Sequence, residues 1–231
     1  RRDFHIAAWL HDCGKITSPV HVVDKATKLE TIYNRIHEVR TRFEVLWRDA
    51  EIDYLMGCLA GQNETELHQH KLTRQEQLQA DFAFIAQSNI GGEFMAPEDV
   101  ERLQDIAQLE WVRHFSNRIG LSQEEALKLP SHPETLPHRE RLLANKPEHV
   151  EEWGDRRPPV EADNPDNIWG FDMTLPAQAF NKGELYNLSV TRGTLTEEER
   201  FVIKDHMVQT IKMLSSLPFP EEFKNVPNIA G

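Results

Sequence analysis

The apolar residues between Lys28 and Ala50 are spaced alternately three and four positions apart, and this spacing constrains the fold more than any other feature. Such spacing places an apolar seam along one side of a long helix and requires a second surface to cover it. We therefore predict a helix over residues 28–50. The surface that covers its seam could be the same helix of a second copy of the chain, in a homodimer. The seam consists of Leu29, Ile32, Ile36, Val39, Phe43 and Leu46.

Further helices are indicated by apolar periodicity and by residues that favour helix ends. Ser122 and Thr196 are each followed three positions later by Glu, which is the capping-box pattern at a helix N-terminus. Residues 185–190 predict one short strand. The fold class is therefore mainly α, with a helical bundle as its base. The other predicted helices are residues 65–88, a helix beginning near Pro97, a short helix after Ser122 and a helix after Thr196.

The segment from Pro130 to Pro176 contains eight of the 13 prolines. Proline removes a backbone donor and breaks regular helices, so we expect loops here. A loop region of this length is uncommon in a compact domain. We expect it either to pack over the helices or to have a regulatory role.

Composition excludes several classes of protein. No apolar run reaches the roughly 18 residues that a membrane helix needs, and the net charge of −12 disfavours binding to nucleic acid. Cys13 and Cys58 are the only cysteines, which favours a reducing, cytoplasmic setting. Because the chain starts at Arg1, close to a motif, we expect it to be a piece of a longer protein, which could itself be anchored in a membrane.

The stretch Ala7-Ala8-Trp9-Leu10-His11-Asp12-Cys13-Gly14-Lys15 ends an apolar helical segment with adjacent imidazole and carboxylate groups. Neighbouring His and Asp side chains can hold one divalent ion, and the second carboxylate oxygen can reach another. Gly14 would permit a tight helix end and Lys15 would supply a cation beside the ions. The motif therefore indicates metal-assisted hydrolysis.

Two separated stretches resemble the HD superfamily of metal-dependent phosphohydrolases, and more narrowly its HD-GYP branch. The first, AAWLHDCGKITSP, runs from Ala7 to Pro19 and is similar to the family's HD-x-GK motif. The second runs from Arg192 to Ala230, beginning RGTLTEEERFVIKDHMVQT, and is similar to the helix that carries the family's next metal-ligand His. The order of the two stretches is that of the family.

The resemblance implies that His11, Asp12 and His206 are metal ligands, with Asp12 bridging two ions. His206 follows His11 by 195 positions, much farther than the roughly thirty of typical members, so we expect a long insertion. His37 lies nearer the usual distance and is the alternative ligand, although it lacks the capping-box lead. We predict an HD-type core from residues 1–46 and 191–231, interrupted by an insertion over residues 47–190.

The function that the resemblance implies is hydrolysis of the cyclic dinucleotide cyclic di-GMP by a metal-bound hydroxide, as part of signal transduction. Lys15 would bind phosphoryl oxygens, and nitrogen and oxygen ligands favour two Fe or Mn ions. The family's remaining ligands do not lie in this chain, so we expect weak metal binding and little turnover. Three alternatives remain. The first is a degenerate HD-GYP domain that binds a nucleotide or a partner protein and regulates instead of hydrolysing. The others are an HD phosphohydrolase that acts on a different phosphoester, and an oligomerising signalling module.

Overall fold

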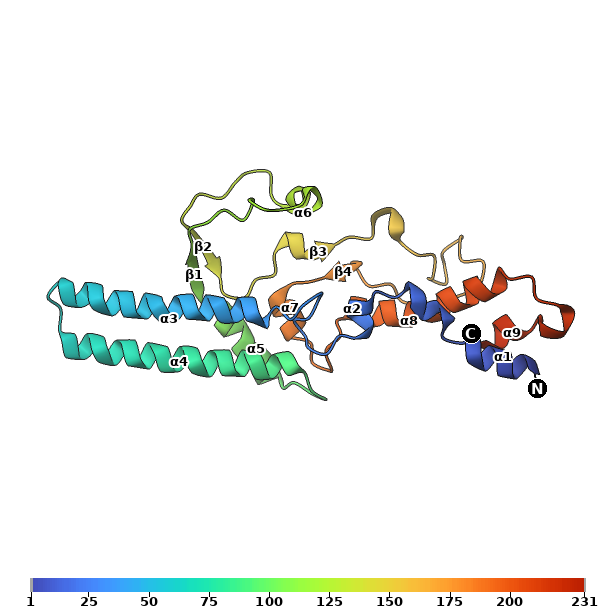
Figure 1. The fold of residues 1–231 in the computed structure, drawn as a ribbon, viewed down its shortest axis with the longest axis horizontal. Coiled ribbons are helices and arrows are strands. Elements are labelled where there is room, and N and C mark those ends of the chain that lie inside the picture. The colour runs from blue at the N-terminus through green and yellow to red at the C-terminus, as the bar shows by residue number, and fades with distance from the viewer. Residues whose placement is uncertain (1, 231) are drawn as a thin grey trace. The chain divides into compact units, whose positions relative to one another are not determined.

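The computed structural model describes residues 2–230, which form two compact units. Of the described residues, unit 1 contains 2–25, 151–181 and 195–230, and unit 2 contains 26–150 and 182–194. Helices dominate both units (Figure 1), which confirms the mainly α fold class. The chain passes from unit 1 to unit 2 after Lys25 rather than near residue 46, and residues 151–181 belong to unit 1. The limits of the predicted insertion, residues 47–190, therefore do not coincide with the boundaries between the two units. The insertion stays a proposal.

Unit 2 is built on a hairpin of two long helices, α3 (Ile36–Leu59) and α4 (Glu64–Ile90), which lie side by side (Figure 1). Asn63 caps α4 by accepting hydrogen bonds from the backbone N–H groups of Thr65 and Glu66. The predicted seam of α3 is buried in this unit, where Phe43 packs edge-on against Phe82 with ring centroids 5.4 Å apart. The seam thus finds its helical partner within the same chain.

Both limits of the predicted 28–50 helix are wrong, because α3 begins only at Ile36 and continues past Ala50 to Leu59. The backbone N–H of Lys28 donates to the carbonyl oxygen of Asn89, at 2.8 Å, and that of Leu29 to the Asn89 side chain, also at 2.8 Å. These donors therefore bind the end of α4 instead of starting a helix. Leu29 is still fully buried, whereas Ile32 is 93% exposed.

The rest of unit 2 contains short elements around the hairpin. The predicted strand at residues 185–190 is wrong: residues 184–188 form helix α7, and Glu184 pairs through both carboxylate oxygens with Arg42, at 2.7 and 2.9 Å. Strands β1 and β2 are antiparallel, with Arg113 opposite His138. These elements are α5 (Pro97–Ala107), β1 (Glu110–Arg113), α6 (Gln123–Lys128), β2 (His138–Arg141), the 3-10 turn η2 (Pro147–His149) and α7 (Glu184–Leu188).

Unit 1 places the two ends of the chain around one long helix, α8. The capping box predicted at Thr196 is present, since Thr196 accepts from the Glu199 N–H and Glu199 accepts from the Thr196 N–H. Ala7, Leu214, Val226 and Ala230 form one small core. The elements are α1 (Arg2–Leu10), η1 (Cys13–Thr17), α2 (Val20–Val23), α8 (Glu197–Ser215), η4 (Glu221–Phe223) and α9 (Val226–Ala230).

Within the predicted loop region from Pro130 to Pro176, the part that follows residue 150 packs onto α8, which is one of the two outcomes predicted for the region. Trp153 lies edge-on against Phe201 with centroids 5.6 Å apart, and Val160 is fully buried beside Phe201 and Val208. Besides the turn η3 (Gly154–Arg156), the regular structure here is the pair of strands β3 (Val150–Glu151) and β4 (Phe180–Asn181).

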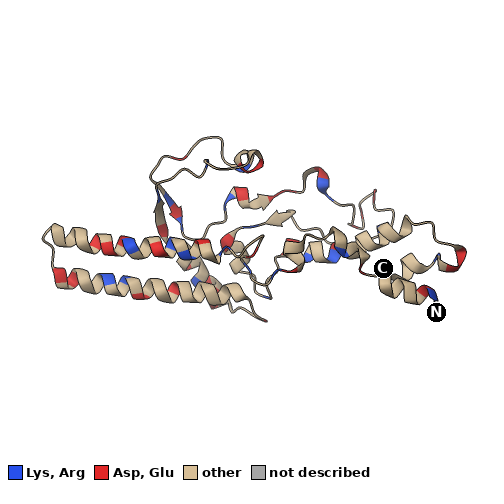
Figure 2. Ribbon diagram, viewed as in Figure 1, with Lys and Arg blue, Asp and Glu red and all other residues tan. Residues whose placement is uncertain are grey.

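Charged residues of both signs are interleaved along α3 and α4 (Figure 2), with pairs one turn apart such as Glu44 and Arg48, at 2.6 Å. Such pairs stabilise a solvent-facing helix by a few tenths of a kcal/mol, about 0.3–0.5 each. Among residues 2–230, no helix has the length and apolar character to cross a membrane.

Candidate metal centre

His11 and Asp12 lie in the turn between α1 and η1. The Nδ1 atom of His11 donates to the carbonyl oxygen of Ala8, at 2.9 Å, since a carbonyl can only accept. This bond orients the ring so that its Nε2 lies 3.3 Å from Asp12 Oδ2. The two side chains are partly exposed, 56% for His11 and 38% for Asp12, so the site is open to solvent.

Helix α8 carries His206 to the other oxygen of the same carboxylate. Its Nε2 lies 3.4 Å from Asp12 Oδ1, while its Nδ1 is bonded to the carbonyl oxygen of Ile203, one turn earlier. The His206 side chain is only 14% exposed. The two imidazoles thus face one carboxylate from two sides, with each Nδ1 held by its own backbone.

The donor set fits a divalent cation. Because the Nδ1 atoms of His11 and His206 carry the hydrogens, their Nε2 atoms present lone pairs, and these face carboxylate oxygens that also only accept. A cation placed among them would satisfy all three groups, and a backbone bond to the remote ring nitrogen is the usual support of a metal-ligating His. Nitrogen and oxygen donors without thiolate suit Mn and Fe, and also Zn.

Lys15 lies beside the same carboxylate, with its ammonium nitrogen 2.7 Å from Asp12 Oδ2. This hydrogen bond and the positive charge of the ammonium group hold the pKa of Asp12 below its usual value. Asp12 is therefore a carboxylate ready to bind a cation. Lys15 itself is half exposed, so its ammonium group can reach an anion in solvent.

Gly14 allows α8 to approach the turn closely, which differs from the helix-end role predicted for it. Its backbone does not have a positive φ, and a Cβ at this position would overlap the carbonyl oxygen of His206 and lie 2.6 Å from the backbone nitrogen of Thr210. Any larger residue would push α8 away. Gly14 thus sets the distance between His206 and the His11-Asp12 turn.

A buried ion pair fixes the first turn of α8 to the N-terminal segment. The Lys25 ammonium donates to both carboxylate oxygens of Glu199, at 2.9 and 2.8 Å, and the Lys25 side chain has no exposed surface. Glu199 is also the capping-box residue of α8. The start of the helix that carries His206 is therefore held by a charge-assisted bond.

His37, the alternative ligand, lies in the first turn of α3 in unit 2. Its Nδ1 accepts a hydrogen bond from the Arg40 guanidinium, at 2.8 Å, since arginine can only donate. In the part of the chain that the structure describes, the side chains paired with Asp12 are His11, Lys15 and His206. The structure thus brings together His11, Asp12, Lys15 and His206, and gives His37 a different partner.

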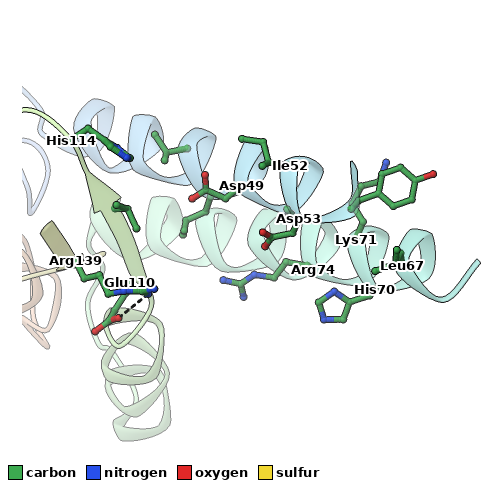
Figure 3. Close-up of a pocket in the computed structure, with 15 residues that line it drawn as sticks. Asp49, Ile52, Asp53, Leu67, His70, Lys71, Arg74, Glu110, His114 and Arg139 are labelled. Atoms are coloured by element: carbon green, nitrogen blue, oxygen red, sulfur yellow. Dashed lines mark ion pairs between the residues drawn. The ribbon is translucent and has the colours of Figure 1, made fainter. Parts of the chain in front are cut away.

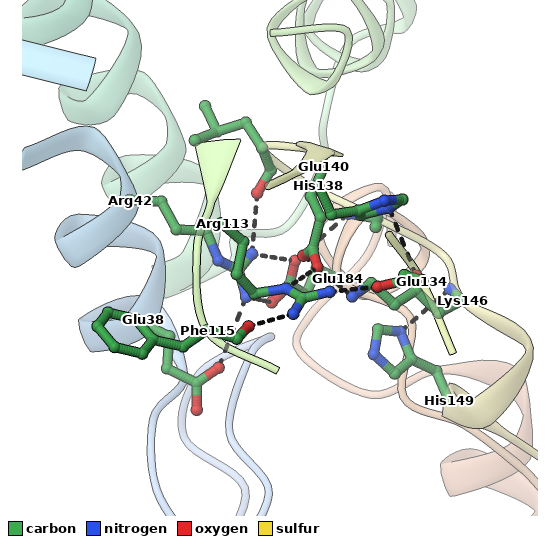
Figure 4. Close-up of polar contacts among 12 residues, drawn as sticks. Glu38, Arg42, Arg113, Phe115, Glu134, His138, Glu140, Lys146, His149 and Glu184 are labelled. Atoms are coloured by element: carbon green, nitrogen blue, oxygen red, sulfur yellow. Dashed lines mark hydrogen bonds and ion pairs between the residues drawn. The ribbon is translucent and has the colours of Figure 1, made fainter. Parts of the chain in front are cut away.

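A second group of possible ligands, which sequence reasoning missed, lies in unit 2. Glu134, His138 and Glu140 each offer an atom within 4.8 Å of the others. The signal was the alternation His-Arg-Glu-Arg from residue 138, which forms β2 where we expected loop. However, Figure 4 shows Arg113 paired with both glutamates, and Lys146 lies 3.2 Å from Glu140.

These cations affect the chemistry of that group. Burial raises the pKa of Glu140. The hydrogen bonds and charges of Arg113 and Lys146 lower it by more than burial raises it, so the net shift is downward. The negative charge that a metal would neutralise is already balanced by Arg113 and Lys146. The group is therefore suited by ligand type to a metal ion but is already satisfied as an ion-pair network.

A cavity of about 710 Å³ lies in unit 2 between the α3–α4 hairpin and the β1–β2 strands (Figure 3). Asp49 and Asp53 line it from α3, and Arg74 lines it from α4. Burial and the Asp53 charge raise the pKa of Asp49. The lining of this cavity carries charges of both signs. It includes none of the residues predicted from the sequence to form a site.

Comparison with known protein families gives one finding. Residues 137–231 match the family model of the HD domain. The match supports the HD superfamily, whose members are metal-dependent phosphohydrolases that bind divalent ions, and it includes α8 with His206. The matched range begins after His11 and Asp12. Searches of curated proteins and of solved structures gave no match.

Proposed function

We propose that this chain is part of a metal-dependent phosphodiesterase domain of the HD-GYP type, which hydrolyses cyclic di-GMP. The observation that supports this most directly is the convergence of two imidazoles on one carboxylate, at 3.3 and 3.4 Å, although His11 and His206 are far apart in the sequence. The HD-domain match over residues 137–231 supports the same reaction class.

In this proposal His11, Asp12 and His206 hold two divalent ions, with Fe or Mn favoured. The two oxygens of Asp12 each face a different imidazole, so the carboxylate can bridge. Divalent ions supply positive charge for phosphoryl oxygens and lower the pKa of bound water. Ala8 and Ile203 hold the rings through their carbonyl oxygens, which leaves each Nε2 facing Asp12, where it would be available to bind a divalent ion.

Lys15 binds the substrate in this proposal. Its ammonium group now donates to Asp12 Oδ2, and a cation on that oxygen would weaken this bond and release the lysine toward a phosphate. A local cation is required because the chain as a whole carries a charge of −12 and repels anions.

The test combines metal binding with product analysis on the full chain. Mn²⁺ is titrated and the free ion is measured by electron paramagnetic resonance, and cyclic di-GMP is incubated with the Mn²⁺-loaded protein and separated by chromatography. We expect Asp12→Ala and His206→Ala to lower Mn²⁺ affinity at least tenfold, and His37→Ala to leave it unchanged. Equal affinity of the His206→Ala and wild-type proteins would contradict the proposed ligand set.

The same experiment separates the alternatives. Because we expect little turnover from this chain, the incubation is prolonged; binding of cyclic di-GMP with no linear product even then would favour a regulatory domain over an enzyme. Hydrolysis of bis-p-nitrophenyl phosphate, but not of cyclic di-GMP, would support a phosphohydrolase with another substrate. Loss of Mn²⁺ binding in Glu134→Gln, with none in Asp12→Ala, would move the metal to the ion-pair network of unit 2.

A further inference from the structure

Thr210 lies one helical turn after His206 on α8, and its side chain has no exposed surface. Its hydroxyl group makes two hydrogen bonds across to the His11-Asp12 turn. It accepts from the backbone N–H of Gly14, at 2.9 Å, and donates to the carbonyl oxygen of His11, at 3.2 Å. One buried hydroxyl therefore joins the backbone on both sides of Asp12 to the helix that carries His206.

We propose that Thr210 is the positioning residue of the metal centre: its hydroxyl sets the register of α8, and with it the position of His206, against His11 and Asp12. This inference rests on the proposed function, because it assigns Thr210 a task toward a metal that His11, Asp12 and His206 would bind. Thr210 itself does not touch the reacting groups.

The geometry of α8 explains why one residue can set the register. Residues four apart lie on the same face of a helix, so His206 and Thr210 face the turn together. The carbonyl oxygen of His206 and the backbone of Thr210 already lie against Gly14, which leaves no room for α8 to move closer. A slip of α8 by one residue would rotate this face by about 100° and break both bonds of the hydroxyl.

The hydroxyl, rather than the bulk of the side chain, carries the argument. Valine has nearly the shape of threonine but can neither accept from Gly14 nor donate to His11. Gly14 is buried, so its N–H would lose its partner and the turn would shift to recover one. Serine keeps the hydroxyl and loses only a methyl group.

The experiment compares Thr210→Val with Thr210→Ser in the full chain, with Ser88→Ala as control. Ser88→Ala removes a buried hydroxyl from unit 2, whereas the residues of the proposed centre belong to unit 1. Mn²⁺ affinity is measured by titration, and amide hydrogen exchange of Gly14 is measured by nuclear magnetic resonance without metal. We expect Thr210→Val to weaken Mn²⁺ binding about 10- to 100-fold, which is typical when a residue that orients a ligand is lost.

Thr210→Val is also expected to speed exchange of the Gly14 amide at least tenfold, whereas Thr210→Ser and Ser88→Ala keep both values within about threefold of the wild type. Rescue by serine separates positioning from simple packing, because serine has less bulk than valine. Wild-type Mn²⁺ affinity in Thr210→Val would overturn this inference alone. Failure of the wild-type chain to bind Mn²⁺ would overturn the proposed function, and the inference with it.

Discussion

Substitution of Gly14 by alanine is the most direct perturbation of the contact between α8 and the His11-Asp12 turn. The new methyl group would overlap the carbonyl oxygen of His206 and lie 2.6 Å from both the backbone nitrogen and the hydroxyl oxygen of Thr210. Two of these three atoms belong to the backbone of α8. They cannot rotate away as the end of a flexible side chain would, so the helix itself must move.

The size of the movement follows from the contact distances. Ordinary van der Waals contact with a Cβ begins at 3.4 Å, so the backbone nitrogen of Thr210 must move by about 0.8 Å, and the carbonyl oxygen of His206, which lies closer still, must move farther. Overpacking of a buried contact costs about 1–3 kcal/mol of folding free energy. A ligand site tolerates displacements of only about 0.5 Å, so we also expect Mn²⁺ affinity to fall about tenfold or more.

The assay is urea denaturation of the metal-free chain, followed by Mn²⁺ titration of the folded variant. Gly92→Ala is the matched control, because a Cβ at Gly92 meets no atom within 4 Å and the residue does not have a positive φ. We expect Gly92→Ala to leave both quantities close to wild type. If Gly14→Ala and Gly92→Ala had the same stability and the same Mn²⁺ affinity, the close approach of α8 to Gly14 would be refuted.

Two further predictions concern buried lysines. Lys25→Met should lower the free energy of unfolding by about 3–5 kcal/mol, because it leaves the buried Glu199 charge without its ammonium partner. Urea denaturation checks this against Lys224→Met, which breaks an exposed ion pair with Glu221 and should cost at most about 1 kcal/mol. Burial lowers the pKa of Lys28 to about 8 from 10.5, so the unfolded chain binds more protons between these values and stability should rise with pH across that window. Lys28→Met should remove this rise, and denaturation midpoints measured from pH 8 to 10 that change equally in both proteins would contradict the shift.

Local capping signals correctly predicted where two helices begin. Both capping boxes are present, at Ser122 and at Thr196, because a cap is made by a side chain and backbone only three residues apart. The helix over residues 65–88 and the helix beginning at Pro97 are confirmed for the same local reasons. The mainly α fold class follows from these elements.

Local signals failed where distant contacts decide the backbone. Residues 28–35 carry part of an apolar helical seam, but Asn89 binds their backbone and delays α3 until Ile36. Residues 185–190 have the composition of a short strand, yet the pairing of Glu184 with Arg42 accompanies a helical turn. The apolar seam of α3 predicted a covering surface but did not decide between the same chain and a second copy. In the structure, α4 of the same chain covers it.

The sequence by itself determined which chemical groups the proposed metal centre can offer, namely two imidazoles, a carboxylate and an ammonium group, and it determined the cap that starts α8. Only the tertiary structure placed His206, rather than His37, beside Asp12. Only the tertiary structure showed that the Thr210 hydroxyl binds the backbone of His11 and of Gly14, on either side of Asp12. The physical reason is the range of the interactions. Side-chain chemistry and helix caps act within a few residues, whereas the approach of α8 to Gly14 depends on close packing between segments almost 200 positions apart.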